Sequence, residues 1–140
     1  MTTLVISTAA TWGMVGVIWM VQLVQYPMLA RYSAHEPSTA AHEHQRRITW
    51  VVGPLMAVEG VTALLLLIDR PDEIATSTAW LAAGLLGVAL ASTVLIQVPL
   101  HTRLGEGHDD DVAKRLIATN WIRTVAWTAR GVVLAGALTA

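Results

Sequence analysis

Four long apolar stretches, joined by short polar segments, set the pattern of hydrophobic and polar positions along the chain. They cover roughly residues 4–26, 48–68, 79–100 and 116–139. Each stretch reaches the ~20 residues that a helix needs to cross a bilayer. We therefore predict an all-α fold, a bundle of four transmembrane helices that forms a single integral membrane domain over residues 1–140.

The composition favours a membrane protein and excludes several other classes. Hydrophobic residues make up 54% of the chain and charged residues only 14%, against about 25% charged in soluble domains. The absence of cysteine excludes disulfides and thiolate metal sites. A net charge of −1 argues against a nucleic-acid partner. The sequence contains no Walker loop, nucleophile elbow or dinucleotide fingerprint, so these catalytic classes are also excluded.

The polar segments predict where helices end and how the bundle is oriented. Pro27 is expected to end the first helix, because proline breaks the hydrogen-bond ladder. The acidic run at 109–111 favours the start of the fourth helix before the membrane. The second connection carries Arg70 alone, whereas the first and third carry Arg31, Arg46, Arg47, Arg103, Lys114 and Arg115. By the positive-inside rule we expect a multi-pass protein of the inner (plasma) membrane with both termini outside the cytoplasm.

The two halves of the chain align as an internal repeat, with residues 4–68 matching residues 79–139. Both halves contain the pattern Q-x-P-[ML]-x-x-R, at 25–31 and at 97–103. Further matches follow in the same order: His35-Glu36 with His108-Asp109, Thr49-Trp50 with Asn120-Trp121, and Glu59-Gly-Val with Arg130-Gly-Val. Because both halves have the same orientation, we predict two parallel helix-hairpin repeats related by an axis along the membrane normal.

The repeat places an acidic residue opposite a basic one. Glu59 lies ~16 Å into the second apolar stretch at 1.5 Å per residue, and Arg130 holds the equivalent position in the fourth. We expect an ion pair near the middle of the bilayer, because pairing lets a bundle tolerate either charge. The pair either serves a catalytic site, by setting its electric field, or only fixes the register of the helices.

A polar face on the fourth helix provides the first part of a candidate site. Its members share one helical face by their spacing: Asn120, Arg123, Thr124, Trp127 and Arg130. If Glu59 neutralises Arg130, then Arg123 has no acidic partner inside the span. It is therefore expected to bind an anion, a carbonyl group or water. Alternatively, its side chain reaches back to the membrane interface.

Further polar residues are expected to converge with Arg123 in a pocket that opens to the cytoplasmic side and ends at the Glu59–Arg130 pair. The expected lining residues are Gln22, Gln25, Thr93, Gln97, Asn120 and Thr124, with Trp19 and Trp127 as flat walls. Such a pocket suits a lipophilic small molecule with an anionic or enolic head, or a quinone-type ring. We expect this molecule and the lipid bilayer to be the partners of the chain.

Histidines offer a rival site on the same side of the membrane. The chain has five of them: His35, His42, His44, His101 and His108. His42, His44 and His101 are the side chains that a transition metal would use, and His44 with His101 is a candidate pair for haem. Their spacing matches no metal signature, so no cofactor is expected, with haem or a transition metal as the alternative. His101 is the candidate general base.

Small residues recur at four-residue steps on the third helix. Ala83, Gly87 and Ala91 form a ridge suited to close contact between helices. A homodimer that packs along this ridge is one expected arrangement.

Several of these motifs also carry a resemblance. The run Asn120-Trp-Ile-Arg-Thr with Trp127 reads N-W-x-R-T-x-x-W, and it accompanies Gln25-Tyr-Pro and Gln97-Val-Pro-Leu-His. In these motifs the chain resembles a family of short, uncharacterised bacterial four-helix membrane proteins, which implies a fold but no activity. In size and layout it is also similar, more remotely, to the membrane class that includes anthrone oxygenases. That likeness implies oxygenation of a lipophilic phenol.

Three functions fit these features. The first is a membrane-embedded binding protein or enzyme, of an oxidoreductase or oxygenase type, for a lipophilic anionic, enolic or quinone-like molecule. In it Arg123 binds the head group, Glu59 with Arg130 sets the field, and His101 moves protons. The second is a small homo-oligomeric transporter or channel. The third is a structural subunit of a larger membrane complex.

Overall fold

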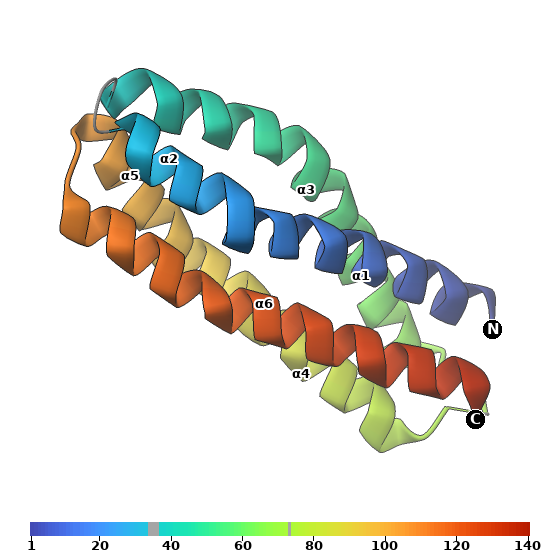
Figure 1. Ribbon diagram of the computed structural model, residues 1–140. Coiled ribbons are helices and arrows are strands. Elements are labelled where there is room, and N and C mark those ends of the chain that lie inside the picture. Colours follow the sequence, from blue (N-terminus) through green and yellow to red (C-terminus); the bar gives the residue numbers. More distant parts are fainter. Residues whose placement is uncertain (34–36, 73) are drawn as a thin grey trace.

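The described part of the chain folds into four long helical rods. The computed structural model describes residues 1–33, 37–72 and 74–140, and these contain helices and no strand. The first rod joins α1 (Thr2–Met20), η1 (Val21–Gln25) and α2 (Tyr26–Ser33), and the second is α3 (Pro37–Ile68). The third joins α4 (Thr76–Ser92), η2 (Thr93–Gln97) and α5 (Val98–Glu106), and the fourth is α6 (Asp110–Thr139). The rods run up and down beside one another, with both termini at one end (Figure 1).

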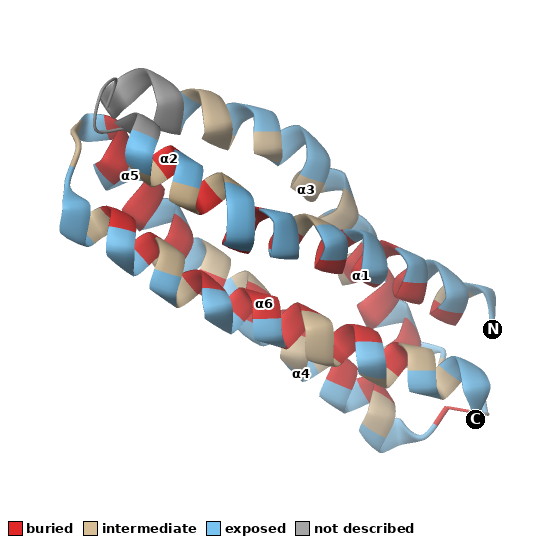
Figure 2. Cartoon of the chain, in the orientation of Figure 1, coloured by how far each residue is buried: buried red, intermediate tan, exposed pale blue. Residues whose placement is uncertain are grey.

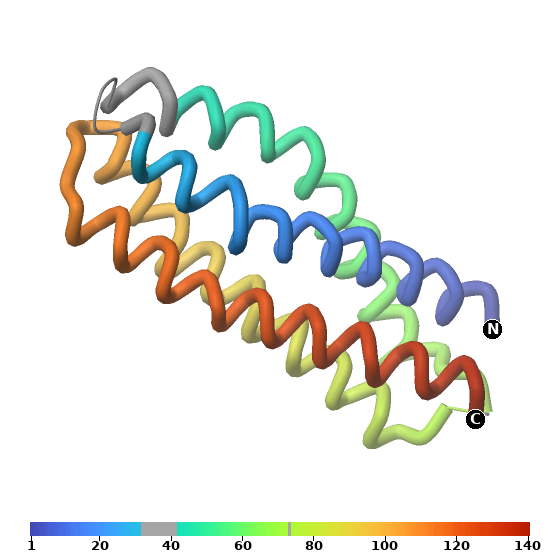
Figure 3. Tube along the Cα trace, viewed as in Figure 1, coloured from blue at the N-terminus to red at the C-terminus, as the bar shows by residue number. Residues whose placement is uncertain are grey.

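The prediction that Pro27 ends the first helix is wrong, because a wider turn carries the helix through it. In η1 and η2 the backbone forms a π-helix, in which Tyr26 N–H bonds to Val21 O and Val98 N–H to Thr93 O. Each of these turns directly precedes an x-Pro pair, at Pro27 and Pro99. One extra residue in the turn moves the carbonyl group with which the proline ring would otherwise clash. Both rods therefore stay continuous (Figure 3).

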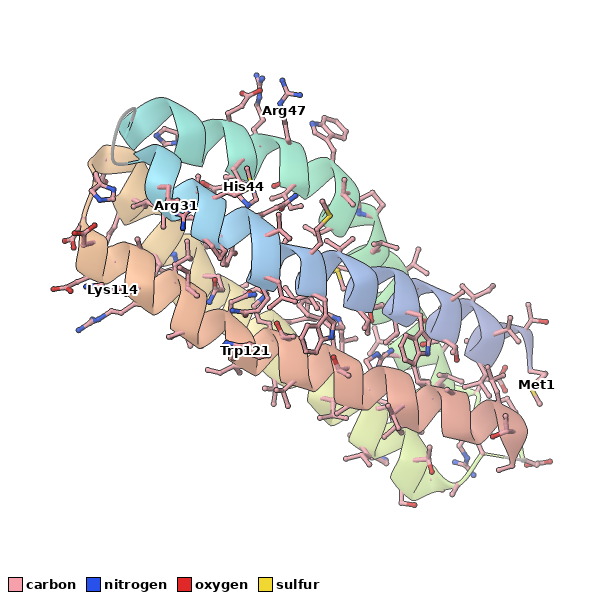
Figure 4. The ribbon with its side chains drawn as sticks, viewed as in Figure 1. Met1, Arg31, His44, Arg47, Lys114 and Trp121 are labelled. Atoms are coloured by element: carbon pink, nitrogen blue, oxygen red, sulfur yellow. The ribbon has the colours of Figure 1, made fainter. Side chains whose placement is uncertain are left out.

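The acidic run before the fourth helix acts as predicted. Asp109 caps α6, where its side chain accepts hydrogen bonds from the backbone N–H groups of Asp111 at 2.8 Å and Val112 at 3.2 Å. Asp110 and Asp111 add negative charge in the first turn, where the helix dipole is positive. The fourth rod consequently starts at the end of the bundle that carries Arg31 and Lys114, opposite Met1 (Figure 4).

Three helical segments of the described chain are long and apolar enough to cross a membrane. They are Thr2–Arg31, His42–Ile68 and Thr76–Glu106. The sequence analysis expected four, and α6 differs because its arginines and polar face lower its hydropathy. The His35-Glu36 match of the repeat lies outside the described residues.

The interior of the bundle contains two apolar clusters and buried polar residues. The helix α6 packs against α1 and α4, while α3 packs against α1, α4 and α5. One apolar cluster contains Leu4, Leu66 and Leu134, and a second contains Met14, Ile18 and neighbours. Ser7, Thr11, Glu59 and Arg130 are buried between the two clusters. Figure 2 shows buried residues along the inner sides of the rods and exposed residues along the outside.

The ridge of small residues on α4 lies away from this interior. Gly87 and Ala91 are exposed and Ala83 is half-buried, and a Cβ placed on Gly87 would meet no atom within 4 Å. The expected homodimer along this ridge stays a prediction.

Candidate functional site

The buried polar residues form two separate groups, the first of which joins all four rods. Glu59 accepts hydrogen bonds from Thr11 Oγ1 at 2.8 Å and from Trp127 Nε1 at 3.0 Å. Arg130 Nε lies 3.4 Å from Glu59 Oε1, and neither side chain is exposed. The guanidinium also donates to Thr11 Oγ1, Ser7 Oγ and the carbonyl oxygen of Ala82. We call these residues the Glu59–Arg130 layer.

Every charged atom of the Glu59–Arg130 layer has a partner. Both carboxylate oxygens accept a hydrogen bond, and all three guanidinium nitrogens donate one. A buried charge pair offsets its loss of hydration only when its remaining donors and acceptors are also satisfied. This group therefore has the properties of a brace for the bundle. The proximity of Glu59 and Arg130 agrees with the sequence analysis, and their depth in a bilayer stays a prediction.

The second group begins with a set of amide contacts between the first rod and α6. Gln22 Nε2 donates to the carbonyl oxygen of Ile117 at 3.1 Å, and Asn120 Nδ2 donates to Gln22 Oε1 at 2.9 Å. Thr124 Oγ1 lies 3.4 Å from the same Gln22 oxygen. These contacts close the space between η1 and α6, so Gln22, Asn120 and Thr124 hold two rods together.

Arg123 is buried but incompletely paired. It is 6% exposed, its Nη1 donates to Asn120 Oδ1 at 3.2 Å, and its guanidinium also donates to the Tyr26 hydroxyl. Its guanidinium carbon lies 5.3 Å from the centre of the Trp127 ring, a favourable cation–π distance. Among the described residues no hydrogen-bond partner meets Arg123 Nε, and no carboxylate forms a salt bridge with this side chain. Arg123 thus keeps a buried donor available for a ligand.

A chain of hydrogen bonds favours one tautomer of His101. Thr119 Oγ1 donates to Arg115 O at 2.6 Å, so it accepts from Gln97 Nε2 at 2.9 Å. That contact turns Gln97 Oε1 toward Tyr26, whose hydroxyl donates to it at 3.3 Å. Tyr26 then accepts from His101 Nε2 at 2.9 Å. This order of donors favours the tautomer with the proton on Nε2, in which Nδ1 is an acceptor.

His101 Nδ1 is buried and has no hydrogen-bond partner among the described residues. The ring is 7% exposed and stacks on His44, with ring centres 5.6 Å apart and planes at 25°. Figure 4 shows His44 on the inner side of α3 and Arg47 pointing away from the bundle. An unpaired imidazole nitrogen of this kind accepts a proton from an acidic ligand.

A single cavity is lined by both Arg123 and His101. It has a volume of about 100 Å³ and lies between the first rod, α3, η2, α5 and α6. Its polar lining includes Tyr26, Gln97, His101 and Arg123, with Thr93 and His44 beside them. Its apolar lining is Met14, Val17, Ile18, Val21, Ile48, Val52 and Val98. We call this space the Arg123 cavity.

Several residues that the sequence placed in the pocket lie elsewhere. Trp19 is 37% exposed and donates to Thr128 at 3.0 Å on the outside of the bundle. Gln25 is half-buried and lines no part of the Arg123 cavity. Trp127 is fully buried beneath Arg123 and belongs to the Glu59–Arg130 layer. Of the predicted residues, Gln97, His101, Arg123 and Thr93 do line one space.

Two of the described histidines, His44 and His101, come together, whereas His42 is exposed and lies against Gly105. In the part of the chain that the structure describes, no three histidine, aspartate or glutamate side chains are grouped closely enough to hold an ion. The pair His44 and His101 is the one that the haem alternative names, and the choice between no cofactor and haem stays a prediction.

Sequence reasoning missed one member of the site, Tyr26. Tyr26 and His44 both line the Arg123 cavity, and their ring centres are 5.9 Å apart. The signal for Tyr26 was its position within the Q-x-P pattern, where the π turn directs it inward. The sequence analysis named His44, but only as a candidate ligand of a metal or haem. Comparisons of the chain with protein-family models, with curated proteins and with solved structures each found no match.

Proposed function

We propose that this chain is an integral membrane protein that binds a lipophilic molecule with an anionic, enolic or quinone-like head in the Arg123 cavity, and that a proton is exchanged with that head there. One observation carries the proposal. Two side chains that are more than nine-tenths buried, Arg123 and His101, each have an unpaired polar atom, and both residues line the same cavity. A complementary ligand head would satisfy both atoms.

Membrane insertion of all four rods is supported by the outer surface of α6. Its arginines Arg123 and Arg130 are buried inside the bundle. The large side chains that it exposes include Ile122, Val125 and Val132. Because its polar face points inward, α6 is suited to lipid despite its lower hydropathy. With most basic residues at the connection end, the proposed orientation puts both termini outside the cytoplasm of a plasma-membrane protein.

An internal duplication is part of the same proposal. The two π turns end at Gln25 and Gln97, which are the first residues of the two Q-x-P patterns. Equivalent positions thus share an uncommon backbone feature as well as sequence. The motif family of four-helix membrane proteins named above is consistent with this architecture.

The chemistry follows from the charges around the cavity. An enolic or phenolic hydroxyl placed between the two side chains would donate its proton to His101 Nδ1. The resulting anion would lie against the Arg123 guanidinium, where a charge-assisted hydrogen bond stabilises it. Tyr26 holds the His101 ring through Nε2, and the proposed step uses the tautomer with the proton on that nitrogen. Activation of this kind suits an oxidoreductase or oxygenase that acts on lipophilic enols or phenols.

The test uses a coloured acid as the ligand. We would titrate the protein in phosphatidylcholine nanodiscs with a 3-alkyl-2-hydroxy-1,4-naphthoquinone and follow its enolate absorption. The wild-type protein is expected to bind the enolate. It should bind the 2-methoxy ether more weakly, because the ether has no acidic proton. Arg123→Leu is expected to lower the enolate affinity by about ten- to a hundredfold, the equivalent of a lost charged hydrogen bond.

The matched control is Arg115→Leu, which removes an exposed arginine elsewhere on α6. It should leave the affinity unchanged. Normal enolate binding by a folded Arg123→Leu protein would refute the assignment.

Transport is less well supported than binding. An ion path through the bundle would have to break the Glu59–Arg130 layer, in which every charged atom is bonded. No feature of the described residues specifically favours a subunit of a larger complex. Flux into liposomes that Glu59→Gln abolishes would instead support the transporter.

A further inference from the structure

The Arg123 cavity is closed at the end of the bundle that carries the connections. There α3 and α5 are in contact. The His42 ring lies so close to Gly105 that a Cβ on this glycine would be 2.8 Å from His42 Cε1. One turn further in, the stacked rings of His44 and His101 bridge the same two helices. A ligand arriving from the polar connections would have to separate both contacts.

The cavity is less well closed at its side. The helix α3 packs closely against α4 and α5 but not against η2, which lies between them in the third rod. Thr49 of α3 and Val98, directly after η2, line the cavity and are both exposed. Thr49 is five residues beyond His44, or ~7.5 Å along the helix. A side opening therefore lies past the closed end.

The surface around this opening is apolar on the side of η2 and mixed on the side of α3. Trp50 is 81% exposed, and Val94 and Leu95 of η2 are 64% and 73% exposed. Gln45 and Arg46 lie beside Thr49 on α3. Exposed apolar side chains of this size are suited to lipid tails rather than to water. The cavity itself combines apolar residues of α1 and α3 with the polar side chains of Arg123 and His101.

We propose that the Arg123 cavity opens sideways into the bilayer between α3 and η2, and that its ligand is an amphiphile whose long apolar chain leaves through this mouth. The sequence analysis expected a pocket open to the cytoplasmic side instead. The inference rests on the proposed function, since the head group occupies the site of Arg123 and His101. It adds the chemical class of the ligand, a membrane lipid with a small acidic head, and its route of entry.

Ligands of graded chain length test this class. In phosphatidylcholine nanodiscs we would compare 2-hydroxy-1,4-naphthoquinones that carry a 3-methyl or a 3-hexadecyl group. Thr49→Trp and Val98→Trp place a large ring in the mouth. Both variants are expected to lower the affinity for the hexadecyl compound about tenfold, because the added ring occupies the space through which the chain passes. The affinity for the methyl compound, which has no long chain to pass through the mouth, should change less than about threefold.

Matched controls use exposed residues that do not line the cavity. Val51→Trp on α3 and Val94→Trp on η2 change the same surface and should leave both affinities as in wild type. Because all four sites are exposed, the variants should fold, which circular dichroism and gel filtration would check. Equal binding of both compounds by the mouth variants and the controls would overturn the sideways opening.

A second measurement locates the mouth without a ligand. The chain has no cysteine, so Thr49→Cys gives a single site for a nitroxide label. In nanodiscs the label should be relaxed more by oxygen, which concentrates in lipid, than by a water-soluble nickel chelate. Stronger relaxation by the nickel chelate than by oxygen would place the mouth in water and refute entry from the bilayer.

The two proposals can fail separately. If the mouth variants have no effect while Arg123→Leu still abolishes binding, only this inference fails. If Arg123→Leu has no effect on either compound, the proposed function fails with it.

Discussion

The two polar groups inside this bundle use the same residue type in opposite ways. Arg123 and Arg130 lie two turns apart on one face of α6, and both are buried. Arg130 donates from all three nitrogens and lies 3.4 Å from a carboxylate oxygen. Arg123 bonds to an amide oxygen and to the Tyr26 hydroxyl, rests on an aromatic ring, lines a cavity and keeps one unpaired nitrogen. Complete pairing indicates a structural role, and incomplete pairing at the same burial indicates a binding site.

The largest effect should come from breaking the paired group. Glu59→Leu leaves Arg130 buried without a neutralising charge, which is expected to cost about 3–5 kcal/mol of unfolding free energy. The measurement is equilibrium unfolding in mixed detergent micelles, followed by circular dichroism. The double variant Glu59→Leu/Arg130→Leu should recover a large part of the loss. Full stability of Glu59→Leu alone would show that the layer is not a brace.

A smaller loss of stability is expected from changing Trp127, which contacts both Glu59 and Arg123. Trp127 donates its indole N–H to Glu59 at 3.0 Å and lies beneath Arg123. Trp127→Phe keeps a ring but removes this donor, for an expected loss of about 2 kcal/mol in the same unfolding assay. Because phenylalanine also supports the guanidinium less well, binding of the naphthoquinone enolate should weaken about two- to fivefold. Unchanged stability would mean that the Glu59 carboxylate does not need this bond.

Removing Arg123 should do little to the fold. Arg123→Leu deletes the hydrogen bonds to Asn120 and Tyr26 but also a buried cation with an unpaired nitrogen, so stability should change by less than about 1 kcal/mol. Comparing the stability losses of Arg123→Leu and Glu59→Leu tests directly whether the two buried groups have different roles. A loss as large as that of Glu59→Leu would assign Arg123 to the framework instead of to a ligand.

The smallest effect is expected outside both groups. Trp19 bonds to Thr128 at 3.0 Å on the surface. Trp19→Phe should change stability by less than about 0.5 kcal/mol and leave ligand affinity unchanged. A clear loss of enolate binding in this variant would restore Trp19 to the pocket wall expected from its sequence position.

The sequence predicted the helices well because apolar length and capping are local properties. The apolar stretches and the acidic start of α6 follow from residues close in sequence, and the proximity of Glu59 to Arg130 was expected from the proposed repeat. The continuation through Pro27 did not follow, since a π turn depends on how the whole rod packs.

The same turn explains the main error within the site. Regular helical periodicity places Trp19 and Tyr26 on one face, yet Trp19 is 37% exposed and Tyr26 is 3% exposed. The five-residue π turn Val21–Gln25 lies between them. One extra residue rotates the following segment by ~100° relative to a regular helix. The tautomer of His101 was also beyond the sequence, because it depends on Thr119, Gln97 and Tyr26 from three different elements.

The wide turn η2 has a consequence for how this fold can diversify. A π turn is equivalent to a one-residue insertion in an α-helix, so deleting a single residue from 93–97 would restore ordinary winding. The segment beyond it would then swing round its own axis and carry His101 away from Arg123. Loss of one codon here would therefore replace His101 beside Arg123 by another residue of the same helix, while the other three rods keep their structure.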